Sequence, residues 1–133
     1  MINRMRVITL WIIFLFGMIF HGNLALMPLF WGESVAMSED IIAKNPFESS
    51  MWMMLTFFLI PMIIIVLTSF IETKWYRITN FVFTLLFTLM NIWHLIGHLG
   101  ETPVDPRQIV LLTFVFISGV MLNIVSFRWL KEE

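Results

Sequence analysis

The chain has 133 residues, of which 59% are hydrophobic and only 13% are charged, and its net charge is −1. A soluble domain carries roughly twice that share of charged residues, so the composition indicates a membrane protein. The chain has no cysteine, which excludes a disulfide, a thiolate nucleophile and a thiolate zinc site. It also has no basic run, phosphate loop or serine-elbow motif, so no motif indicates a nucleic-acid partner or an enzyme.

Four apolar stretches are long enough to cross a bilayer, which takes about 20 residues per helix. They are residues 7–29, 50–71, 79–99 and 108–129. The connections between them are short and leave no room for a soluble domain. We therefore predict one all-α domain, residues 1–133, folded as an antiparallel four-helix bundle that spans the lipid bilayer.

The first span follows a basic N-terminus and could be mistaken for a secretory signal. It is long, rich in bulky aromatic residues and lacks a cleavage site of small residues, so we expect it to be retained. Gly17, His21 and Ala25 recur every four residues along it, and such a stripe lets a second helix approach closely.

The basic residues predict how the bundle is oriented. Most of the eight lie on the inner side if the N-terminus is cytoplasmic, and this distribution follows the positive-inside rule. The inner set is Arg4, Arg6, Lys74, Arg77, Arg128 and Lys131, which leaves Lys44 and Arg107 outside. Both termini are therefore expected in the cytoplasm.

Local signals place the boundaries of the helices. Ser38, followed by two acids, is a suitable N-cap for a short amphipathic helix in the first outer loop, which Asn45-Pro46 would end. The tight turn Glu72-Thr73-Lys74 makes the second and third spans antiparallel neighbours, and Pro61 is expected to kink the second span. Gly100 can end the third span, and Asp105-Pro106 can begin the fourth.

The third span has a polar edge that lipid cannot satisfy. Its members fall within an arc of about 120° on a helix of 3.6 residues per turn. They are Asn80, Thr84, Thr88, Asn91, His94 and His98. We expect this polar seam to face other helices, and we expect Asn123 of the fourth span to reach Asn80 or Thr84.

The three histidines, His21, His94 and His98, all fall in the outer half of the predicted bundle. Imidazole binds zinc, copper and haem iron, and two histidines four residues apart can chelate one ion from a single helix face. The three residues could form a metal site completed by Glu48 or Glu101.

Other interpretations of the histidines stay open. His21 and His94 could be axial ligands of a haem held between two helices. Met51, Met53 and Met54 near the outer end of the second span offer soft sulfur, which would favour copper. The interpretation we favour from the sequence is that His21 and His94 are hydrogen-bonded structural residues with no cofactor. A role in handling protons or a quinone is the remaining alternative.

Four segments carry a resemblance to a known family: Thr9-Leu10-Trp11, Met18-Ile19-Phe20, Ile60-Pro61-Met62-Ile63 and Tyr76-Arg77-Ile78-Thr79-Asn80. The chain resembles a bacterial family of small four-helix inner-membrane proteins whose function is uncharacterised. The resemblance implies an inner-membrane location and the four-helix topology, and it assigns no catalytic or binding residue.

Three functions remain from these observations. The first is a non-enzymatic membrane protein that acts by association, as a homo-oligomer or as an accessory subunit of a larger complex. The second is a metal- or haem-binding membrane protein with its site near the outer surface. The third is a small transporter or channel formed by oligomerisation.

Overall fold

The computed structural model describes residues 1–132, and this part of the chain is all-helical. Its elements are α1 (Ile2–Leu26), the 3-10 helix η1 (Met27–Trp31), α2 (Glu39–Lys44), α3 (Phe47–Phe70), α4 (Lys74–Leu99) and α5 (Pro106–Leu130). Four of the helices are long and apolar enough to cross a membrane, and they cover the four spans expected from the sequence. The four apolar helices fit a small multi-pass membrane protein.

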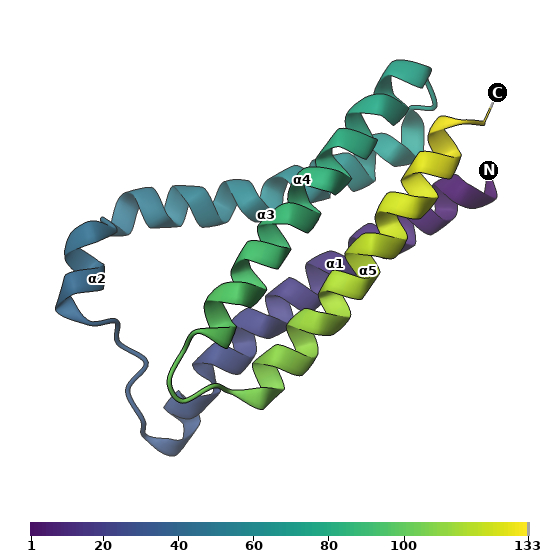
Figure 1. The fold of residues 1–133 in the computed structure, drawn as a ribbon. Helices are drawn as coiled ribbons and strands as arrows, with labels where there is room; N and C mark the ends of the chain where they lie inside the picture. Colours follow the sequence, from purple (N-terminus) through teal and green to yellow (C-terminus); the bar gives the residue numbers. More distant parts are fainter. Residues whose placement is uncertain (133) are drawn as a thin grey trace.

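Three of the long helices form a closely packed unit (Figure 1). α5 packs along both α1 and α4, and the two chain termini lie together at one end of the unit. A Cβ atom added at Gly17 of α1 would lie 2.5 Å from Cγ2 of Val115 in α5, so this glycine allows the close approach that its spacing predicts. Ala25, in contrast, is exposed.

Aromatic side chains fill the centre of this unit. Trp11 and Phe14 of α1 meet Phe87 of α4 edge to face, with ring centroids 5.5 and 5.8 Å apart. Such edge-to-face contacts are favourable because the positive rim of one ring meets the negative face of another. Leu112, Val115 and Leu122 of α5 complete the core, which holds the three helices at a defined register.

The helix α3 joins this unit through only part of its length, which differs from the expected four-helix bundle. Its buried residues are Pro61, Ile64 and Thr68, and no residue before Pro61 is buried. α3 is one continuous helix through Pro61, and its first half extends away from the other helices (Figure 1). This half is apolar on nearly every face, so its sequence favours no face for contact with protein over contact with lipid.

The turn between α3 and α4 keeps these two helices in contact near the termini. The Tyr76 hydroxyl donates to the Ile64 carbonyl oxygen at 2.8 Å and lies 2.8 Å from Thr68 Oγ1. Phe57 still reaches Phe87, with ring centroids 5.2 Å apart. The expectation of antiparallel neighbours therefore holds from Phe57 to the turn, whereas the residues of α3 before Phe57 extend away from α4.

Two arginines tie the helix ends together beside the termini. Arg4 of α1 donates to the Thr68 carbonyl oxygen at 2.7 Å and pairs with Glu72. Arg77 of α4 donates to the Trp129 carbonyl oxygen at 3.1 Å and stacks over the Trp129 ring. Cationic side chains at helix C-termini satisfy carbonyl groups that have no partner within the helix.

The residues predicted to cap the helices lie at helix boundaries. Asp105 precedes α5, and its carboxylate accepts a hydrogen bond from the Arg107 backbone N–H at 3.0 Å. Hydrogen bonds from Arg107 hold the pKa of Asp105 below its ordinary value. Ser38 precedes the short α2, as expected, although its side chain makes no capping hydrogen bond.

Candidate metal centre

The polar edge of α4 faces α1 and α5 over most of its length, but His94 is exposed, so the expectation that the whole edge faces other helices is wrong at this residue. Asn80, Thr84, Thr88 and Asn91 are each less than a tenth exposed. Asn80 accepts a hydrogen bond from the Trp11 indole N–H at 3.0 Å and donates to Ser126 Oγ at 3.1 Å. These bonds connect all three helices of the packed unit through one amide.

Asn123 of α5 does not reach Asn80 or Thr84, and this part of the expectation is wrong. Its amide donates to Thr88 Oγ1 at 3.0 Å, one turn further along α4 than Thr84. Ser126 takes the place beside Asn80 instead. The reason is the register of two antiparallel helices, which periodicity within each helix does not determine.

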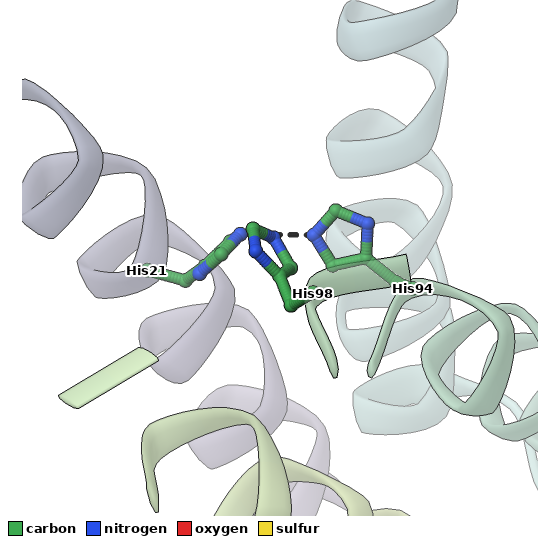
Figure 2. Close-up of side chains that lie close together, drawn as sticks. All are labelled: His21, His94 and His98. Carbon is green, nitrogen blue, oxygen red and sulfur yellow. Dashed lines mark hydrogen bonds between the residues drawn. The ribbon is translucent and has the colours of Figure 1, made fainter. Parts of the chain in front are cut away.

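All three histidines of the chain meet at the end of the bundle opposite the termini (Figure 1). His21 lies near the C-terminal end of α1, and His94 and His98 lie near that of α4. One potential ligand atom from each lies within 4.8 Å of the other two. The three rings are mutually near-perpendicular, with centroids 4.8 to 4.9 Å apart, as Figure 2 shows.

His21 makes two hydrogen bonds with Gln108 of α5, one through its ring and one through its backbone, and sequence reasoning missed this partner. His21 Nδ1 lies 2.6 Å from Gln108 Oε1, and Gln108 Nε2 donates to the His21 carbonyl oxygen at 3.2 Å. Because the amide oxygen can only accept, Nδ1 carries the proton and Nε2 keeps its lone pair. One signal was available: Gln108 is a polar residue near the start of an apolar span, and α5 starts at the same end of the bundle at which α1 ends. The structure buries this side chain.

His94 and His98 have different surroundings. His94 Nε2 lies 2.9 Å from His21 Nε2, and because the latter holds a lone pair, His94 is the donor in this bond. His98 Nδ1 lies 3.0 Å from Glu101 Oε1, within ion-pairing distance. His21 is buried, His98 is partly buried and His94 is exposed, so the cluster opens to one side.

This arrangement fits the dimensions of a single metal ion. A tetrahedral ion with metal–nitrogen bonds of about 2 Å holds its nitrogens about 3.3 Å apart. The nitrogens of the cluster span 2.9 to 4.8 Å, so small side-chain movements would bring them to that spacing. The three histidines could therefore bind a metal.

The same distances fit a haem poorly. Two axial imidazoles stand on opposite sides of the iron, with nitrogens about 4 Å apart at bonds of about 2 Å each, and the porphyrin lies between them. His21 Nε2 and His94 Nε2 are 2.9 Å apart and share a hydrogen bond, which leaves no room for a porphyrin plane.

The other residues expected near the site divide into two groups. Glu101 lies beside His98, whereas Glu48 is exposed in the first turn of α3. Met51, Met53 and Met54 are exposed on the half of α3 that extends away from the packed helices. No contact between these methionines and the histidines supports the copper interpretation in the described residues.

Comparison of the chain with protein-family models, with curated proteins and with solved structures finds no match. The resemblance to a family of small inner-membrane proteins is therefore not confirmed. The four apolar helices and the histidine triad fit a small helical membrane protein with a candidate metal site.

Proposed function

We propose that this chain is a multi-pass membrane protein that binds one transition metal ion through His21, His94 and His98. The observation that carries the proposal is the meeting of three imidazoles from two helices, with one ring already oriented by Gln108. Imidazole suits zinc, copper, nickel and iron, and in metal sites its second nitrogen commonly donates to an oxygen as His21 Nδ1 does.

The test measures the metal content of the full-length protein in detergent after loading with zinc and removal of excess ion. We expect one ion per chain in the wild type and none in His94→Ala or His21→Ala, because two imidazoles bind far more weakly than three. Asn23→Ala, an exposed polar position on α1, is the matched control and should retain the ion. Equal metal content in His94→Ala and the wild type would contradict the proposal.

We further propose that the termini face the cytoplasm of a cell whose inner membrane contains the protein. Arg4, Arg77 and the other inner basic residues belong to the end of the bundle where the termini lie. This distribution follows the positive-inside rule and supports an outward-facing histidine site.

Association is a second candidate function, as a homo-oligomer or as an accessory subunit. The half of α3 before Pro61 buries no residue within its own chain, so its apolar surface is available to a partner helix as well as to lipid. Native mass spectrometry in mild detergent should then detect more than one chain per particle. A monomer at every concentration would exclude the homo-oligomer. No feature of the described residues favours a transporter or channel over these two functions.

A further inference from the structure

We infer that the ion held by His21, His94 and His98 keeps one coordination position open, where water or a small inorganic anion binds reversibly. The inference rests on the proposed metal binding and adds the class of exchangeable ligand. Structural zinc sites are closed by four protein ligands, whereas sites that act on a ligand use three and leave the fourth position to water.

The number of protein donors supports an open site. Among residues 1–132, the group of metal-ligating side chains around this point consists of the three histidines, with no carboxylate in the same group. The chain contains no cysteine that could close the site with sulfur. Three nitrogens leave a four-coordinate ion one ligand short.

The nearby polar side chains lie against His21 and His98. Both ends of the Gln108 amide bond His21, at 2.6 and 3.2 Å. The Glu101 carboxylate lies 3.0 Å from His98 Nδ1, so that His98 Nε2 is the nitrogen left for an ion. Oxygen atoms beside the second nitrogen of a metal-binding histidine commonly orient its ring.

The open side of the cluster lies at His94. Its ring is exposed, while His21 and His98 are more enclosed. The part of α3 that could have covered this end of α4 extends away from it, and no residue of α3 before Pro61 is buried (Figure 1). A small ligand can therefore reach an ion bound to the three rings from the end of the bundle, since α4 ends at Leu99 and residues 99–104 are exposed. Figure 2 shows the three rings close together.

The experiment uses the full-length protein in detergent, loaded with cobalt(II), whose visible absorption reports the number and kind of its ligands. Azide is the probe anion. We expect azide to change the visible bands of the wild-type complex in a saturable manner. Glu101→Gln should weaken cobalt binding roughly 10- to 100-fold, as removal of an orienting partner does, and should keep the azide response. Glu33→Gln, an exposed acid in the first outer loop, is the control and should change neither property.

Three results would overturn the inference, and they can be told apart. Cobalt that binds without any response to azide would mean a closed site, with the proposed metal binding intact. An azide response that appears only in Glu101→Gln would make this carboxylate the fourth ligand. If the wild-type protein binds no cobalt, zinc or nickel, the proposed function itself fails.

Discussion

At the scale of residues, α4 carries two buried asparagines that differ in their partners. Asn80 bonds both Trp11 and Ser126, whereas neither polar atom of the Asn91 side chain has a hydrogen-bond partner. Both side chains are at most 3% exposed, so burial does not distinguish them. The difference in partners predicts opposite effects of the same substitution.

We expect Asn80→Leu to destabilise the protein by about 1–3 kcal/mol, because it leaves the Trp11 indole N–H and the Ser126 hydroxyl buried without a partner. Asn91→Leu is the matched substitution on the same edge of the same helix. It removes an amide without a bond to lose and should leave the stability equal or higher. Denaturation of both variants in mixed detergent micelles measures the difference, and equal losses would contradict this account of the polar seam.

The positions of the three histidines also depend on contacts between helices. His94 and His98 share a helix face by their spacing, so the sequence predicts that they act together. His21 comes from another helix, and it belongs to the cluster because Gln108 of a third helix turns its ring toward them. His21 is thus positioned by a contact with another helix, which the spacing of residues along one helix does not predict.

At the scale of elements, the approach of α1 to α5 depends on one glycine. A methyl group at Gly17 would lie 2.5 Å from Val115 Cγ2, and Val115 is β-branched and therefore stiff. Gly22, further along α1, has no atom within 4 Å of the same position. The two glycines make a controlled comparison within one helix.

Gly17→Ala should destabilise the protein by about 1–3 kcal/mol, because the extra methyl forces α1 and α5 apart. Gly22→Ala should be neutral or stabilising by up to about 1 kcal/mol, since alanine is the better helix former. Thermal unfolding in detergent, followed by circular dichroism, compares the two variants. A harmless Gly17→Ala would mean that the two helices can shift without cost.

The sequence of α3 predicts that this segment is a helix, but it does not predict how the helix packs. Its length and apolar composition predict a span, and the structure contains that helix. Its first half has no polar edge comparable to that of α4, and so no seam ties it to the other helices. Hydrocarbon solvates apolar side chains as well as a protein core does, which removes the driving force that would pack such a helix in water.

At the scale of the whole molecule, the sidedness of the bundle can be tested directly, because the chain lacks cysteine. Thr73→Cys lies in the exposed turn near the termini, and Thr102→Cys lies in the exposed connection near the histidines. With cytoplasmic termini, a membrane-impermeant maleimide added to intact cells with a permeabilised outer barrier should label Cys-substituted position 102 and not position 73. The reverse pattern would place the candidate metal site in the cytoplasm.

The amino-acid sequence alone predicts the four apolar spans, the residues that begin and end the helices, and the polar edge of α4. These follow from hydropathy, capping chemistry and the 3.6-residue period, which act within one segment of chain. The family resemblance and the membrane orientation stay predictions.

Four features emerge from the folded chain and not from the sequence. They are the meeting of His21 with His94 and His98, the bonds from Gln108 to His21, the bond from Asn123 to Thr88, and the extension of the first half of α3 away from the other helices. Each of these depends on the register and crossing of helices. Register follows from how the surfaces of two helices fit together, as where the Val115 side chain fills the space beside Gly17. The period of a single helix contains no information about its neighbour.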